Sequence, residues 1–154
     1  KLVVFLSLLL LLVSVIGISS YFLFKDKINL LDVDHSAVDW NGKKQKDTSG
    51  EENTIAIPGF EKVTLYANET TQAVNFHNPE INDCYFKISL IHPDGSVLWI
   101  SDLIEPGKGM YSIELEKTLA VGEYENAVLK YECFSLNDQS PLNGSEINLK
   151  LVVV

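Results

Sequence analysis

Residues 84–100 read CYFKISLIHPDGSVLWI and carry the pattern of a β-hairpin. Apolar side chains alternate with others over 84–90, and one face collects the residues Cys84, Phe86, Ile88 and Leu90. A period of two residues is typical of a strand with one buried face. The HPDG stretch at 92–95 predicts a tight turn, because proline presets φ and glycine supplies a positive φ. We therefore expect antiparallel strands at 84–90 and 96–100.

The same alternation extends outward from this hairpin in both directions. It predicts further strands over 62–67, 71–76, 110–115, 122–133 and 147–153. No segment after Lys27 shows a sustained helical period. Short strands separated by turns every 8 to 12 residues, over about 100 residues, are typical of a β-sandwich. We therefore expect an all-β domain, an antiparallel immunoglobulin-like sandwich of roughly seven or eight strands.

The 23 residues from Leu2 to Phe24 contain no charge. At about 1.5 Å per residue, a helix of this length crosses the roughly 30 Å hydrocarbon core of a bilayer. A secretory signal peptide is the alternative, but its apolar region is usually about 7 to 15 residues and ends in a small-x-small site. The residues before Lys25 are bulky instead. We expect one transmembrane helix over 1–24, kept as an anchor, that binds the membrane through Leu2–Phe24.

Residues 25–53 separate this anchor from the predicted sandwich at 54–154. They are rich in charge and glycine and show no lasting period, which favours a flexible tether. The part over 28–40 has a second interpretation, packing against the membrane surface or against the domain. Lysines flank the anchor on both sides, so their count does not orient it. We expect a single-pass cell-membrane protein with the C-terminal domain outside, because a disulfide-compatible β domain suits export.

The charge balance disfavours polyanionic partners. The chain has 12 basic residues, all lysine, and 21 acidic ones, for a net charge of −9. Recognition of phosphates and base edges relies on arginine and on a basic surface. We therefore expect no nucleic-acid partner.

The two cysteines, Cys84 and Cys133, share strand parity with apolar neighbours, so both are expected to point into the core. There they have the orientation to face each other and form a disulfide. Closing a loop of 133 − 84 = 49 residues would stabilise the fold by roughly 4 kcal/mol in the chain-entropy model. The alternative is a pair of buried free thiols that act as small hydrophobic groups.

Motifs that carry catalysis or bind cofactors are not recognisable in the chain. The histidines His35, His77 and His92 lack the spacing of metal ligands. The Asp32-Val33-Asp34 stretch resembles the start of a calcium loop, but the loop's required glycine and glutamate positions hold other residues. We expect no enzyme, and no catalytic, cofactor-binding or metal-binding residues.

Two tyrosines are candidates for stacking on a sugar ring. Tyr66 and Tyr85 fall on predicted outer faces of the sheets, where an aromatic row would suit a pyranose. The alternative is that each belongs to a cross-strand pair that stabilises the sheet.

Several segments resemble known protein groups. Tyr131-Glu132-Cys133, after Gly122-Glu123-Tyr124, resembles the Tyr-x-Cys strand of immunoglobulin-like domains, in which the tyrosine closes a corner. The segments IAIPGF (55–60), NPEINDCYFKISL (78–90), LWISDLIEPGKG (98–109) and AVLKYECFSLNDQSPLNGSEI (127–147) are similar to a group of small membrane-anchored, single-domain proteins of Gram-positive gut bacteria. This resemblance covers most of 53–154 and implies an anchor, a tether and an extracellular β domain, without site residues.

From these patterns we expect a non-enzymatic, surface-displayed module that binds another protein or assists assembly of the cell envelope. The alternative function is a carbohydrate-binding module at the cell surface. A membrane anchor, a tether and a β domain fit either function, because a fold by itself does not specify one.

Overall fold

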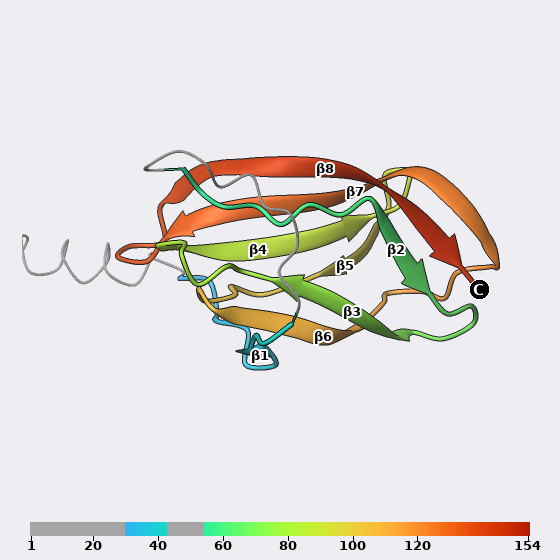
Figure 1. Cartoon of the computed structure of the whole chain (residues 1–154), viewed down its shortest axis with the longest axis horizontal. Helices are drawn as coiled ribbons and strands as arrows, with labels where there is room; N and C mark the ends of the chain where they lie inside the picture. Colours follow the sequence, from blue (N-terminus) through green and yellow to red (C-terminus); the bar gives the residue numbers. More distant parts are fainter. Residues whose placement is uncertain (1–29, 43–53) are drawn as a thin grey trace, which may run out of the picture. The chain divides into compact units, whose positions relative to one another are not determined.

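The computed structural model describes residues 30–42 and 54–154, and Leu31–Val154 form one compact unit (Figure 1). The predicted anchor, Leu2–Phe24, lies outside the described residues, as does most of the predicted tether. Within the described ranges there is no helix long and apolar enough to cross a membrane.

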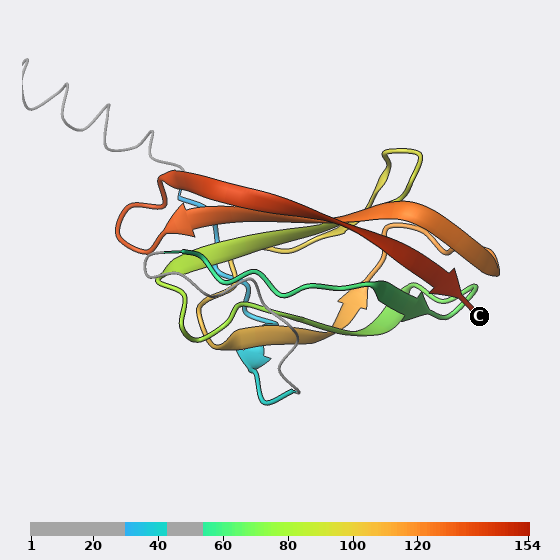
Figure 2. The same cartoon turned by 45° about the horizontal axis from the view of Figure 1, so that its top comes forward.

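Two β-sheets make up this unit, and Figure 2 shows them as two layers. The larger has five strands in the order β2 (Lys62–Leu65), β8 (Pro141–Val153), β7 (Gly122–Ser135), β4 (Cys84–Ile91) and β5 (Val97–Ile100). The smaller has three in the order β1 (Val38–Asp39), β6 (Lys108–Glu114) and β3 (Thr71–His77). All neighbours are antiparallel except β2 and β8, which run parallel. The prediction of an all-β sandwich is confirmed.

The hairpin at 84–100 forms as its sequence predicts. Leu90 lies opposite Trp99 across β4 and β5, and the N–H of Gly95 donates to the carbonyl of His92 at 2.8 Å. Gly95 has a φ of +86°, a value that glycine adopts without steric cost. The apolar face of β4 is fully buried between the two layers, which is why alternation over 84–90 is a reliable signal here.

Aromatic rings fill the middle of the core. Phe76 of β3 lies between Phe60 and Trp99, with ring centroids 5.4 and 5.8 Å apart. Phe86 meets Tyr131 edge to face at 5.3 Å within the larger sheet. Edge-to-face geometry is favourable for aromatic pairs, and full burial of such rings is a major source of stability.

A β-bulge interrupts the pairing of β7 and β8 near the end of the sheet. Tyr131 lies opposite Ser145, but Cys133 lies opposite Leu142, so β8 carries one extra residue there. Gly144 sits in this bulge, and a Cβ on it would lie 2.2 Å from the carbonyl oxygen of Tyr131. Beyond this bulge the pairing continues, so β8 begins at Pro141, whereas the sequence predicts a strand only over 147–153.

Residues 31–42, which we call the strap, fall within the segment whose sequence favours a flexible tether. The structure instead places the strap on the sandwich, the second interpretation of this part of the chain. Its first half pairs with the loop after β5: the N–H of Leu103 donates to Asp32, and that of Asp34 donates to Leu103, at 2.9 and 2.8 Å. Its second half contributes β1, which pairs with β6 of the other sheet. The strap therefore joins the edges of both sheets, through hydrogen bonds that hydrophobic periodicity does not reveal.

Trp40 holds the end of the strap. Its ring stacks on His77 with centroids 3.8 Å apart and an interplanar angle of 8°, and its Nε1 donates to Oδ1 of Asn75 at 2.7 Å. Gly109 allows this approach, because a Cβ there would lie 2.7 Å from Trp40 Cδ1. The last residues of the strap are thus anchored on β3 and β6.

Candidate functional site

The larger sheet has a face that points away from the smaller sheet, which we call the outer face. On β4, β7 and β8 its residues alternate with buried core residues such as Phe86 and Leu129. The strand register sets them in four rows: Tyr85, Phe134 and Pro141; Lys87 and Glu132; Ser89, Lys130 and Glu146; Ile91, Val128 and Asn148. All but Ser89 are partly or fully exposed.

Apolar and charged side chains are separated by row on this face. The two end rows carry apolar side chains, Tyr85 and Phe134 at one end and Ile91 and Val128 at the other. The two middle rows carry two lysines and two glutamates, so their formal charge sums to zero in a chain of net charge −9. A partly exposed face that combines aromatic, aliphatic and balanced charged side chains has the mixed composition of protein surfaces that bind other proteins.

A hollow of about 330 Å³ lies on the outer face above the bulge. Its outward-facing lining includes Phe134, Pro141, Lys130, Glu132 and Glu146. Lys130 Nζ lies 3.6 Å from Glu132 Oε1 on the rim, and both side chains are more than one-third exposed. The hollow therefore offers an aromatic wall together with charged groups that remain in contact with water.

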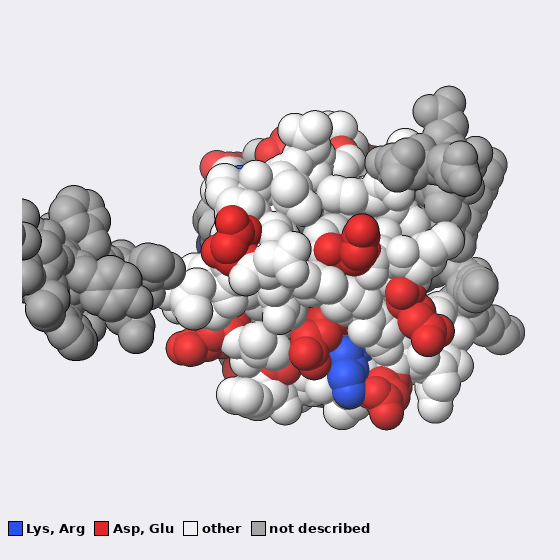
Figure 3. Space-filling view, turned by 90° about the vertical axis from the view of Figure 1, so that its left-hand side faces the viewer, with Lys and Arg blue, Asp and Glu red and all other residues white. Residues whose placement is uncertain are grey.

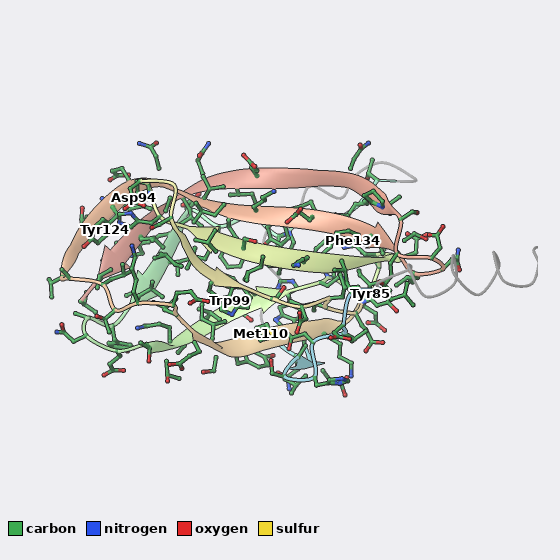
Figure 4. All side chains as sticks on the ribbon, turned by 180° about the vertical axis from the view of Figure 1, so that it is seen from behind. Tyr85, Asp94, Trp99, Met110, Tyr124 and Phe134 are labelled. Carbon is green, nitrogen blue, oxygen red and sulfur yellow. The ribbon has the colours of Figure 1, made fainter. Side chains whose placement is uncertain are left out.

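The structure separates the two tyrosines predicted to stack on a sugar. Tyr85 lies opposite Phe134, and Figure 4 shows these two side by side at one end of the sheet. Tyr66 follows β2, whose last residue Leu65 pairs with Val153, itself opposite Gly122 at the other end of β7. The 134 − 122 = 12 residues of β7 between these positions span about 40 Å. Tyr66 and Tyr85 therefore do not form one platform.

Phe134 is the residue of this face that the sequence analysis missed. It follows Cys133, so the alternation over 127–133 already places it on the outer side of the strand. Its pairing with Tyr85, however, depends on β7 lying next to β4. Tyr85 is thus a member of a cross-strand pair, and the pair itself faces solvent.

The two cysteines lie side by side on one sheet, although the prediction had them facing each other across the core. Cys84 is opposite Ser135 and Cys133 is opposite Phe86, so the cysteines are diagonal neighbours on β4 and β7. Both are free thiols with about 1% exposure. The hydrogen bond between them lowers the pKa of Cys84 and raises that of Cys133, while burial opposes ionisation of both. Burial therefore keeps this pair from acting as an exposed thiolate nucleophile.

The tyrosine that closes a corner is Tyr124, and not the Tyr131 suggested by the Tyr-x-Cys pattern. The hydroxyl of Tyr124 donates to the carbonyl of Ala120, four residues back, at 2.9 Å. Its ring also meets His92 edge to face at 5.0 Å. Tyr131 lies in mid-strand, is fully buried, and donates to the carbonyl of Pro58 at 3.4 Å. Burial raises the pKa of Tyr131.

The end of the sandwich that carries the β3–β4 and β7–β8 loops is acidic. Figure 3 shows acidic side chains spread over this end and few basic ones. Exposed acidic residues of these loops, of the strap and of the connection between β5 and β6 include Asp39, Glu80, Asp83, Asp102, Glu105 and Asp138. Lys108 Nζ lies 2.6 Å from Asp39 Oδ1, which lowers the pKa of Asp39 and raises that of Lys108. This end disfavours anionic ligands.

The three histidines lie in different surroundings. His77 lies buried under Trp40, His92 lies 3.0 Å from Asp94 in the β4–β5 turn, and His35 is exposed in the strap. In the part of the chain that the structure describes, no three His, Cys, Asp or Glu side chains are grouped as a metal site.

Comparisons with protein families, with curated proteins and with solved structures find no match to this chain. Function is therefore inferred from the described surface. The outer face combines partly exposed aromatic groups, balanced charge and a hollow, and so it is the candidate binding site.

Proposed function

We propose that this chain is a non-enzymatic protein-binding module with an immunoglobulin-like fold, displayed outside the cell on an N-terminal membrane anchor. The observation that supports binding is the outer face, where Tyr85 and Phe134 are half-buried, with part of each ring open to solvent, beside a hollow of about 330 Å³. Aromatic side chains are enriched in protein interfaces and among the residues that contribute most to binding, and here they lie next to the charged row of Lys87 and Glu132.

Strand order supports the immunoglobulin-like description. The larger sheet begins with a parallel β2–β8 pair and continues through antiparallel β7, β4 and β5, while β6 and β3 pair in the other layer. Tyr124 closes a corner at the start of β7, as a tyrosine does in immunoglobulin-like domains. The cysteines differ from that pattern, because both lie in the larger sheet.

Membrane display is supported by the uncharged run Leu2–Phe24 and by the charge of the domain. The described chain enters the sandwich beside the β7–β8 loop, where the N–H and carbonyl of Leu31 bond to the side-chain amide of Gln139 at 2.6 and 3.0 Å. This is the acidic end. Anionic headgroups would repel it, which favours a domain that stands clear of the membrane.

Carbohydrate binding is the second candidate function, at a site that differs from the one predicted from the sequence. Tyr85, Phe134 and the hollow replace the predicted pair of Tyr66 and Tyr85. Glu132 and Glu146 on the hollow's lining supply acceptors for sugar hydroxyls. Binding on a glycan array that is lost on Phe134→Ala and kept on Tyr66→Ala would favour this function over protein binding.

Photo-crosslinking in the native membrane tests protein binding. A benzophenone amino acid placed at Phe134 of the full-length chain should form protein adducts on illumination, because Phe134 lies on the outer face. The same group at Tyr66, about 40 Å away along the sheet and 54% exposed, is the matched control. Equal adducts at both positions, or none at Phe134, would contradict the proposal.

A further inference from the structure

We propose that the partner of the outer face is a second copy of this chain, so that two sandwiches pack face to face through β4, β7 and β8. The inference rests on the proposed function, since it assigns an occupant to the same surface. Its basis is that the charged pair of β7 and the apolar ends of β4 and β7 complement themselves under a twofold rotation.

The charged rows determine how the two copies are aligned. Consider a twofold axis in the interface, perpendicular to β7 and passing between Lys130 and Glu132. The rotation sets the two β7 strands antiparallel and exchanges neighbouring rows, so Lys130 faces Glu132 of the second copy. The same rotation sets Glu132 against Lys130 of the second copy. Each copy thus uses the same patch, as an isologous interface requires.

The apolar rows match under the same rotation. Val128 comes to face Phe134 of the second copy, and Ile91 comes to face Tyr85 of the second copy, because the end rows exchange as well. The hollow beside Phe134 lies where Val128 of the second copy arrives. Apolar contacts would then lie at both ends of the interface, on either side of the charged pairs.

Charge also favours this face over the acidic end. Two copies of a chain with net charge −9 repel each other, and that repulsion is least where the local charge is balanced. The middle rows hold Lys87, Lys130, Glu132 and Glu146. Lys150, further along β8, is engaged by Glu123 and Glu125 at 2.6 and 2.8 Å within its own chain.

The size of the face implies a weak dimer. Three strands over eight residues cover roughly 400 Å² on each copy, about half of what stable complexes usually bury per partner. Anchoring both copies in one membrane raises their effective concentration without any new contact. We therefore expect the dimer in membranes, and weak association in dilute solution.

Charge reversal with rescue by mixing tests the inference on full-length chains in neutral-lipid vesicles. Donor and acceptor fluorophores at the C-terminus report association as energy transfer above the level of random mixing. Lys130→Glu and Glu132→Lys should each lower self-association about tenfold or more, because like charges would then face each other. Mixing the two variants should restore transfer, because every facing pair is again opposite in sign. Lys117→Glu reverses an exposed charge on the connection between β6 and β7, which belongs to none of the four rows, and should leave self-association unchanged.

Rescue by mixing also shows that both variants are folded. If the single variants associate as the unmodified chain does, or if mixing restores nothing, the twofold register is wrong. If the unmodified chain shows only random transfer while Phe134 still crosslinks to another protein, self-association is refuted and protein binding stands. If Phe134 forms no adduct at all, both proposals fail.

Discussion

Tyr124 illustrates how a single hydroxyl can organise a connection between the two layers. Its bond to the carbonyl of Ala120 closes the turn that leads from the smaller sheet into β7. The same ring packs against His92, so the corner contacts the β4–β5 turn. Figure 4 shows Tyr124 and Asp94 together at the end of the sheet opposite Tyr85 and Phe134.

Replacing Tyr124 with phenylalanine should therefore lower the free energy of unfolding by about 1 kcal/mol, the usual net value of one hydrogen bond. The ring remains, so the contact with His92 is kept. Tyr66→Phe is the control, since its side chain is 54% exposed and should be neutral. Urea unfolding of residues 31–154 measures both. Equal stability of the two variants would show that the corner bond contributes nothing.

The thiol pair carries a second prediction at this scale. Cys84 and Cys133 touch on neighbouring strands, so in an oxidising compartment we expect their sulfur atoms to join, with two protons and two electrons passing to the oxidant. Alkylation of the exported protein after denaturation without reductant should then modify neither cysteine. Mass spectrometry counts the modified residues. Two alkylated cysteines would establish the alternative of buried free thiols.

At the scale of elements, the strap is held differently from the strands of the core. Most of its residues are exposed, and its attachment consists of hydrogen bonds, the ion pair of Asp39 with Lys108 and the stack of Trp40 on His77. Segments with few buried apolar contacts open more readily than the core. The strap is therefore expected to be the least stable part of the described sandwich.

Trp40→Ala should release the strap without unfolding the domain. Hydrogen exchange at the amides of Asp34 and Leu103, which bond between the strap and the loop after β5, should become faster. Amides of β4 and β7 should keep their protection, because their pairing does not involve Trp40. Val38→Ala, at a half-exposed position of the strap, is the control. Unchanged exchange in the Trp40 variant would show that the hydrogen bonds alone hold the strap.

At the scale of the whole molecule, the expected arrangement is an anchor followed by an exported domain. Leu31–Val154 form one compact unit, so residues 31–154 should fold without the preceding segment. The full-length chain should sediment with membranes, because Leu2–Phe24 is uncharged and long enough to span. The shortened chain should remain in the supernatant with a cooperative unfolding transition.

Protease treatment of intact cells tests the orientation. A tag at the C-terminus should be removed from the outside, because we expect the domain to be exported. Digestion of a cytoplasmic marker only after lysis shows that the cells are intact. A C-terminal tag that resists protease until lysis would place the domain inside and remove the reason to expect a disulfide.

Local patterns in the sequence were sufficient for the class of fold. Alternation over 84–90 and the HPDG turn predict the first hairpin, and the same period predicts the inward side of β7 and β8. These signals are readable because strand side chains alternate strictly between a buried and an exposed face. Tyr85 was recognisable as an outward residue for the same reason.

Only the tertiary structure decided which strands, and therefore which side chains, lie next to each other. Which strand lies beside β4 determines that Tyr85 meets Phe134, that Cys84 meets Cys133 in one sheet, and that Tyr66 lies far away. The strap and the Tyr124 corner likewise depend on hydrogen bonds to distant or irregular backbone. Alternation specifies the face on which a side chain lies, but pairing between strands remote in sequence depends on the packing of the whole core.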